Sequence, residues 1–291
     1  MRRFVRAVCI TSICTAMMTS PSAADFTARD LAIEEAKFAA HSVNNGMRAA
    51  FLEFFADQSW LLRPDLVDAK TWLFARPDPP IVLDWKSQRT ILSASGDLGF
   101  STGPWIRRSK ANPNAPAAHG QFFSVWQKQK NGKWKVLIDH GISHDATVTP
   151  DALPTKPLVG LGLAPMKLKP VVLAFDAEND FVNRAQQPYI DCVTNRTVLL
   201  RDGLFPIEGK TAVMAYVNSQ DGAWVWTPKL QGASSANDFA YVVGNVAGKT
   251  QKGETRTGHY IRVWMRDASG EAPTRWTIAA EVLTLELPAK L

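Results

Sequence analysis

Two hydrophobic periodicities follow one another along the chain. The first is helical, because apolar residues recur every three or four positions after residue 30. These residues are Ile33, Ala36, Ala40 and Val43. They predict a helix that buries this stripe. "TARD" before the stripe is typical of a capping box, with Thr27 as the N-cap and Asp30 three residues later. "NNG" at 44–46 breaks the pattern, and the apolar residues from Met47 onward predict a second helix.

The second periodicity is two residues. It occurs in "ILSASGDLGFSTGPW" (91–105), "GQFFSVWQKQ" (120–129) and "KWKVLIDHG" (133–141). This alternation predicts three or four antiparallel strands with one richly apolar face, which the preceding helices must cover. In the last segment, one face carries Trp134, Val136, Ile138 and His140. We expect this face to point inward, and the fold class is α+β.

The pattern occurs twice. Gly120 precedes Trp126 by six residues, and Gly258 precedes Trp264 by the same interval. Other landmarks keep equal spacing: Trp85 and Asp97 correspond to Trp226 and Asp238, and Trp134 and Asp139 correspond to Trp276 and Glu281. Upstream, "LLRPDLVDAKT" corresponds to "LLRDGLFPIEGKT". Differences in length fall between these elements, as in a structural duplication.

A proline-rich segment separates the two copies. Residues 150–170 contain prolines at 150, 154, 157, 165 and 170. Proline at this density is incompatible with a helix or the interior of a sheet, so we expect an extended linker. The predicted domains are therefore residues 25–149 and 171–291.

The repeated segments resemble a known fold family. "SGDLGFSTGPW" and "HGQFFSVWQKQKNGKWKVLIDHG" resemble the second half of the nuclear transport factor 2-like fold, in the bacterial branch related to SnoaL-type cyclases and ketosteroid isomerases. "VLLRDGLFPIEGKTAV" with "GHYIRVW" gives the second copy a similar but more diverged appearance. The resemblance implies two cones, each with a curved sheet around a pocket. This superfamily includes isomerases, dehydratases, cyclases and non-catalytic binding proteins, so the resemblance selects no function.

The resemblance also implies an internal contact. Members of this fold often dimerise through the outer faces of their sheets, and two copies in one chain would form that contact as a pseudo-dimer. We expect Trp126 and Trp264 on this outer face, because large aromatic side chains are rarely left in water. Further dimerisation between chains stays open.

The N-terminal residues predict a location, and the net charge argues against nucleic acid as a partner. "MRRFVR", an apolar stretch and "SPSAA" are typical of a secretory signal peptide at residues 1–24. They predict export, and we expect the protein in the periplasm. Cleavage would remove Arg2, Arg3 and Arg6 and lower the formal charge from +6 to +3. So small a charge does not describe a nucleic-acid-binding protein, and the apolar stretch is too short for a retained membrane anchor. Cys192 is left as a single thiol, which we expect to be buried.

Acid–base chemistry has two candidates. His140 would be a general base if it points inward, since histidine titrates near neutral pH. Asp97 would orient it if a bulge at "SGDLG" turned Asp97 inward. The alternative is a hydrogen-bonded, structural His140 at the edge of the core. Asp97 and Asp139 both have acidic counterparts in the second copy, which favours a structural role at the seam between the copies.

A ligand pocket has its own candidates. The residues expected to line it are Trp60, Trp85, Trp105, His119 and Phe122. Their alternative role is in the core or the seam. The sequence has no Gly-x-Ser-x-Gly, phosphate-binding loop, His-Glu-x-x-His or Cys-x-x-Cys motif, so we expect no metal and no cofactor.

Three functions fit these observations. The first is binding of a small apolar or aromatic molecule in the N-terminal cone, with the second copy as a structural partner. The second is a cofactor-free isomerase, dehydratase or cyclase that uses His140. The third is a module that contacts another protein, which would show an exposed apolar patch outside the seam.

Overall fold

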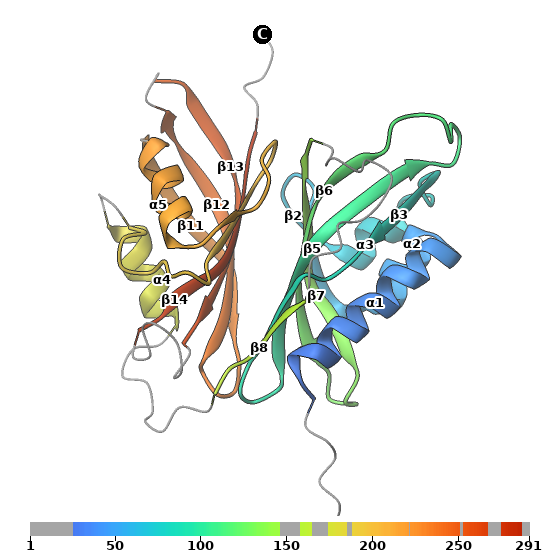
Figure 1. Ribbon diagram of the computed structural model, residues 1–291, viewed down its shortest axis with the longest axis horizontal. Helices are drawn as coiled ribbons and strands as arrows, with labels where there is room; N and C mark the ends of the chain where they lie inside the picture. Colours follow the sequence, from blue (N-terminus) through green and yellow to red (C-terminus); the bar gives the residue numbers. More distant parts are fainter. Residues whose placement is uncertain are drawn as a thin grey trace, which may run out of the picture.

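The chain folds into two halves whose sheets pack face to face, with the helices on the outer sides (Figure 1). The computed structural model describes residues 26–145, 158–164, 174–184, 188–220, 222–250, 253–266 and 275–286. The expected signal peptide at 1–24 lies outside these residues. We call residues 26–145 with 158–164 the N-terminal half, and the described residues from 174 to 286 the C-terminal half.

The N-terminal half contains three helices and a mixed sheet in its described residues. Its elements are α1 (Ala28–Asn45), α2 (Met47–Phe54), β1 (Phe55–Leu62), β2 (Leu66–Asp68), α3 (Ala69–Phe74), β3 (Ile81–Trp85), β4 (Arg89–Leu92), β5 (Leu98–Ser109), β6 (Ala118–Lys128), β7 (Trp134–His144) and β8 (Val159–Gly162). The strand order is β2-β1-β7-β6-β5-β4-β8, and β3 also pairs with β5. The capping box at Thr27 and the second helix from Met47 are confirmed.

The C-terminal half repeats this plan. Its elements are α4 (Ala174–Asn183), β9 (Val198–Arg201), β10 (Ile207–Glu208), α5 (Lys210–Ser219), β11 (Gly222–Ala233), β12 (Phe239–Thr250), β13 (Thr255–Met265) and β14 (Thr277–Leu285). The strand order β10-β9-β14-β13-β12-β11 matches the order β2-β1-β7-β6-β5 of the first sheet, with β11 in the place of β3 and β4. In the N-terminal half β1 runs parallel to β7, and in the C-terminal half β9 runs parallel to β14.

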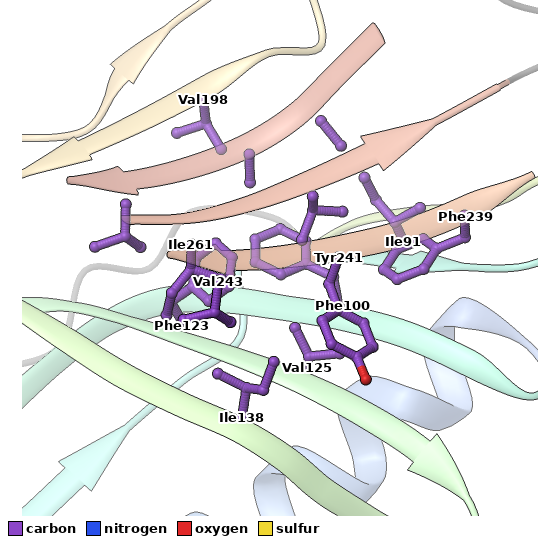
Figure 2. Close-up of a cluster of buried hydrophobic side chains, with 14 of the residues drawn as sticks. Ile91, Phe100, Phe123, Val125, Ile138, Val198, Phe239, Tyr241, Val243 and Ile261 are labelled. Carbon is purple, nitrogen blue, oxygen red and sulfur yellow. The ribbon is translucent and has the colours of Figure 1, made fainter. Parts of the chain in front are cut away.

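The apolar faces of the two sheets form the seam. Figure 2 shows Phe100, Phe123, Val125 and Ile138 of the N-terminal half opposite Tyr241, Val243 and Ile261 of the C-terminal half, all of them buried. The strand alternation was therefore predicted correctly, but its apolar face packs against the other sheet rather than under the helices. Trp126 and Trp264, expected in the seam, instead lie in the clusters beneath the helices.

A β-bulge in β7 and another in β14 explain why the side chains predicted to share one face of the strand lie on two different faces. Val125 pairs with Ile138 while the next residue, Trp126, pairs with Val136, so Leu137 is an extra residue in β7. Ala279 is the corresponding extra residue in β14. One extra residue moves every later side chain to the opposite face. Trp134 and Val136 therefore face the helices, whereas Ile138 and His140 do not.

The buried face of α1 also differs from the prediction. Ile33 and Val43 of the predicted stripe are 47% and 40% exposed. The buried positions are Ala28, Leu31, Glu35, Phe38, Ala39 and Ser42. This face repeats at helical spacing too, but it contains Glu35, whose carboxylate is buried because indole N–H groups from the sheet bind it. A buried carboxyl group with its own hydrogen-bond donors could not be found from a pattern of apolar residues.

Two matching turns connect the halves. The Asp97 carboxylate accepts a hydrogen bond from the Ser235 backbone N–H at 2.9 Å, and the Asp238 carboxylate accepts one from the Ala94 N–H at 2.7 Å. This reciprocal exchange confirms that Asp97 and its counterpart lie at the seam and bind backbone groups there.

The expected linker is partly a strand. Residues 159–162 form β8, which pairs in parallel with β4 at the edge of the first sheet. Residues 150–157 and 165–170 of the segment lie outside the described residues. Cys192 is buried as expected, and burial raises the pKa of its thiol to about 12.

Candidate functional site

A cavity of about 420 Å³ opens in the N-terminal half between its helices and the inner face of its sheet. It is lined by Met47, Phe51, Arg63, Trp72, Pro79, Ile81, Leu83, Trp85, Trp105, Arg107, Phe122, Asp139, His140, Gly141 and Ser143. Aromatic and aliphatic groups predominate, with a few polar groups among them. Such a combination is typical of small-molecule sites.

Two glycines make room for one wall of this cavity. A Cβ atom on Gly120 would lie 2.4 Å from ring atoms of Trp105, and one on Gly141 would lie 3.3 Å from its Nε1. Trp105 Nε1 donates a hydrogen bond to the Ile142 carbonyl at 3.1 Å. The indole is therefore held flat against β6 and β7. Gly120, a landmark of the repeat, is required here by close packing.

Asp139 is the buried acid of the cavity. Its Oδ2 accepts a hydrogen bond from Ser124 Oγ at 2.9 Å. Burial raises the pKa of Asp139 to about 7, against the opposing effects of the Arg63 charge and the Ser124 hydrogen bond. A carboxyl group with this pKa exchanges its proton near neutral pH, so it can accept a proton from a bound molecule or pair with a cationic one.

Glu35 of α1 lies behind the aromatic wall. Its two carboxylate oxygens accept hydrogen bonds from Trp85 Nε1 at 2.8 Å and from Trp126 Nε1 at 2.7 Å. Burial raises the pKa of Glu35 to about 8, the two indole donors oppose this rise, and the charge of Asp139 adds to it. The two acids therefore disfavour each other's ionisation.

The predicted ligand-binding residues are only partly brought together. Trp85, Trp105 and Phe122 line the cavity. Trp60 instead packs at the edge of the seam. His119 is buried at the start of β6, opposite Ile106 and His144 in the sheet, and is not among the lining residues.

The predicted catalytic pair is separated. His140 contributes to the cavity wall, but its Nε2 lies 3.0 Å from Thr284 Oγ1 of the C-terminal half, so its ring points toward the seam and the expected inward orientation is wrong. Burial and the charges of Arg63 and His259 lower the pKa of His140 to about 3. A base with so low a pKa is weak at neutral pH. Asp97 lies in the turn that binds Ser235 and does not orient His140.

Asp139, rather than His140, points into the space between the sheet and the helices. The expectation that Asp139 lies at the seam is wrong for the same reason, the bulge at Leu137. Glu35, Arg63 and Ser124 were not singled out from the sequence. A signal was present, because Glu-x-x-Phe recurs as Glu35–Phe38 and Glu178–Phe181, and Leu-Leu-Arg recurs at 61–63 and 199–201.

The interior of the C-terminal half is organised around an arginine. Arg262 is fully buried, with Nε 2.7 Å from Glu281 Oε2 and Nη1 2.7 Å from Glu178 Oε1. Its guanidinium lies 3.7 Å from the ring centroid of Phe181 and 4.8 Å from that of Trp226. Burial alone would raise the pKa of Glu281, but the charges of Arg262 and Arg201 hold this pKa below its ordinary value.

Comparison with known proteins gives likenesses in fold. No protein-family model matches the chain, and no curated protein is significantly similar to it. Among solved structures, a ketosteroid isomerase-like protein from Erwinia carotovora is 19% identical over 40% of this chain and 95% of its own, with a TM-score of 0.32. A nuclear transport factor 2-like superfamily protein from Salmonella enterica is 10% identical over 43% of this chain and 96% of its own, also with a TM-score of 0.32.

A third similar structure is a nuclear transport factor 2-like protein of unknown function from Shewanella oneidensis. It is 21% identical over 38% of this chain and 83% of its own, with a TM-score of 0.25. Each of these single structures thus spans about two-fifths of the chain. The likeness does not bear on function.

Two further observations concern metal binding and membrane spanning. They contain no cluster of three or more His, Cys, Asp or Glu side chains placed to hold a metal ion. Within the same part of the chain, none of the helices has the length and apolar character needed to span a membrane.

Proposed function

We propose that the N-terminal half binds a small aromatic molecule in the cavity that ends at Asp139. One observation carries this proposal: a cavity of about 420 Å³ has aromatic walls and a single buried carboxyl group, Asp139, among its lining residues. Aromatic walls provide apolar contact area, and the carboxyl group orients a polar substituent of the ligand. The C-terminal half, with Arg262 in its interior, acts as the structural partner.

The test is a thermal-shift screen of the full chain against small aromatic compounds, with Trp105→Ala as the matched variant. A ligand at 100 times its Kd adds about 2.7 kcal/mol of stability. We expect hits whose shift is lost in Trp105→Ala, because that change removes one wall of the cavity. Hits that shift the variant as much as the wild type would contradict the proposed site.

Proton transfer is a second candidate, and the pKa of Asp139 favours it. A general base works best when its pKa lies near the operating pH, as that of Asp139 does and that of His140 does not. A carbonyl compound that binds in the cavity would then exchange its α-hydrogens in D2O, which NMR detects. Exchange that persists in Asp139→Asn would exclude Asp139 as the base. We place no reaction on the bound molecule beyond this exchange.

A role in contacting another protein receives less support. The exposed large apolar residues of the described chain are spread over several elements, singly or in adjacent pairs: Ile33, Val43, Phe74, Leu158, Val159, Ile190, Leu204, Phe205 and Val225. Isolated exposed apolar residues are ordinary on protein surfaces.

Export is part of the proposal as well, and the sequence of residues 1–24 supports it. Expression of the full chain in a bacterial host followed by N-terminal sequencing tests this point. A mature protein that begins at Asp25 is expected in the periplasmic fraction, whereas an intact N-terminus in the cytoplasm would contradict it.

A further inference from the structure

The two halves place different side chains at the same interior position. Ser124 and Arg262 both lie two residues before the tryptophan at the bulge, and both contact the acid on the neighbouring strand. Ser124 Oγ is 2.9 Å from Asp139 Oδ2, and Arg262 Nε is 2.7 Å from Glu281 Oε2. The chain thus supplies its own cation to one acid and only a hydroxyl to the other.

The surroundings of this position correspond in the two halves. The groups around the Arg262 guanidinium are Phe181, Trp226, Tyr260 and Trp264. Their counterparts in the N-terminal half are Phe38, Trp85, Phe122 and Trp126, four aromatic residues again. Trp85 and Phe122 line the cavity beside Asp139. Aromatic faces attract cations electrostatically, and the attraction is strongest where water is excluded.

The charges of the two interiors differ by one cation. The charged groups joined by ion pairs around Arg262 are Glu178, Glu281, Arg201 and Arg262 itself, two acids and two bases. The counterparts in the N-terminal half are Glu35, Asp139, Arg63 and the uncharged Ser124. Two acids there face one arginine. Arg63 donates to the Leu62 carbonyl, as Arg201 does to Leu200, but Arg201 also lies 2.5 Å from Glu281.

We infer that the N-terminal cavity binds a small organic monocation, an aromatic ammonium or amidinium, with its charged nitrogen beside Asp139 and its ring against Trp85, Trp105 and Phe122. This inference rests on the proposed binding function and specifies the ligand class. The ligand takes the place that the Arg262 guanidinium holds in the other half. It restores the balance of two acids and two cations.

The same comparison disfavours an anionic ligand. A carboxylate in the cavity would lie near Asp139 and Glu35, and it would have to compete with Asp139 for Arg63. Arg107, the other arginine in the lining, is exposed, so its interaction with a buried anion would be screened by water. The charge of Asp139 adds to the raised pKa of Glu35, so the two acids destabilise each other in the absence of a cation.

The first experiment is isothermal titration calorimetry of the full chain with four compounds of similar size and different charge. These are benzylammonium, benzamidinium, benzyl alcohol and benzoate. At pH 8 we expect the two cations to bind at least about tenfold more tightly than benzyl alcohol, and benzoate to bind most weakly. Asp139→Asn should weaken binding of the cations by about 10- to 100-fold and that of benzyl alcohol much less.

Asp84→Asn is the matched control, because Asp84 is on β3 in the same half and lies between the lining residues Leu83 and Trp85 without lining the cavity itself. It should leave all four affinities within about twofold, well inside the 10-fold change that a lost charge-assisted hydrogen bond produces.

The second experiment needs no variant. The charged and titratable groups near Asp139 are Glu35 from α1, Arg63 after β1, and the lining residues Arg107 and His140, and Asp139 must ionise to pair with a cation. The affinity for benzylammonium should therefore rise about tenfold per pH unit between pH 5 and 7, and more slowly from pH 7 to 8, where Glu35 ionises. The heat of binding in buffers of different ionisation enthalpy should report release of a proton.

The third experiment transplants the internal cation. Ser124→Arg should abolish binding of benzylammonium because the new guanidinium occupies its place. Unchanged binding in Ser124→Arg would overturn the inference, as would cations that bind no better than benzyl alcohol. If benzyl alcohol or benzoate binds best and Trp105→Ala abolishes that binding, the proposed function stands and the cation inference fails. If none of the four compounds binds at millimolar concentration, the cation inference fails, and the thermal-shift screen still decides the proposed function.

Discussion

The two halves share one framework, and a single interior position sets them apart. Arg262 fills the C-terminal interior and joins Glu178 to Glu281, whereas Ser124 leaves Asp139 facing a cavity. Around this position the order of the central strands, the bulge and one hydrogen bond from a tryptophan to a glutamate (Trp126 to Glu35, Trp264 to Glu178) are the same. The two copies of a duplicated fold can therefore differ in what occupies the interior, an arginine in one and a cavity in the other.

The largest expected effect comes from breaking the internal ion pairs. Arg262→Met should destabilise the protein by about 3–5 kcal/mol, because two buried carboxylates lose their partner. Ser124→Ala at the corresponding position should cost only about 1 kcal/mol, the contribution of one hydrogen bond. Urea denaturation of both variants measures the difference. Equal losses would mean that Arg262 is not what distinguishes the halves.

Opposite responses to pH are the second expectation. The pKa of Glu35 is raised from 4.5 to about 8, so the stability it contributes is complete below pH 4.5 and is lost as the pH rises through about 8. The pKa of Glu281 is lowered, so its contribution is present above pH 4.5 and is lost as the pH falls. For Glu35 the difference between 4.5 and about 8 corresponds to at most about 5 kcal/mol.

Hydrogen exchange followed by mass spectrometry can separate these two effects. After correction for the intrinsic rate, peptides of α1 should lose protection between pH 5 and 8, while peptides of α4 should keep theirs. Parallel behaviour of the two helices would contradict the assignment of the charges.

The seam turns should respond alike, because they are the symmetric part of the molecule. Asp97→Asn and Asp238→Asn each replace a carboxylate that accepts several hydrogen bonds across or within the turn. Each should cost about 1–3 kcal/mol in urea denaturation, the range for hydrogen bonds to charged groups. A large loss for one variant and none for the other would show that the turns are not equivalent.

The smallest effect is expected at His140. The corresponding residue of the other half is Val282, so His140→Val should cost at most about 1 kcal/mol, the price of one lost hydrogen bond to Thr284. Because the pKa of His140 is lowered to about 3, its ring should remain neutral from pH 5 to 8. NMR of the imidazole nitrogens checks this, and titration near pH 6.5 would restore His140 as a candidate base.

Local features were accessible from the sequence. The capping box at Thr27, the second helix at Met47, the duplication and the shared seam position of Asp97 and Asp238 all depend on residues close together in the chain or on repeated spacing. Three of the five expected ligand-binding residues line the cavity for a similar reason, since large aromatic residues on strands were sought directly.

The site itself was not accessible in this way. Glu35 is buried because indole N–H groups 50 and 91 residues further along the chain bind its carboxylate. Asp139, and not His140, points toward the helices because β7 has one extra residue, Leu137. The effect of this residue appears only when β6 and β7 pair. Neither interaction leaves a local pattern.

The sequence by itself determined that the chain would form helices, then strands, twice, because period and capping act within a few residues. Tertiary structure decided which sheet face met the other sheet and which acid faced a cavity. The physical reason is that alternation gives a strand two different faces but does not determine what packs against each of them. Only the pairing of strands, the bulge and the packing of the second sheet assign one face to the seam and the other to the site.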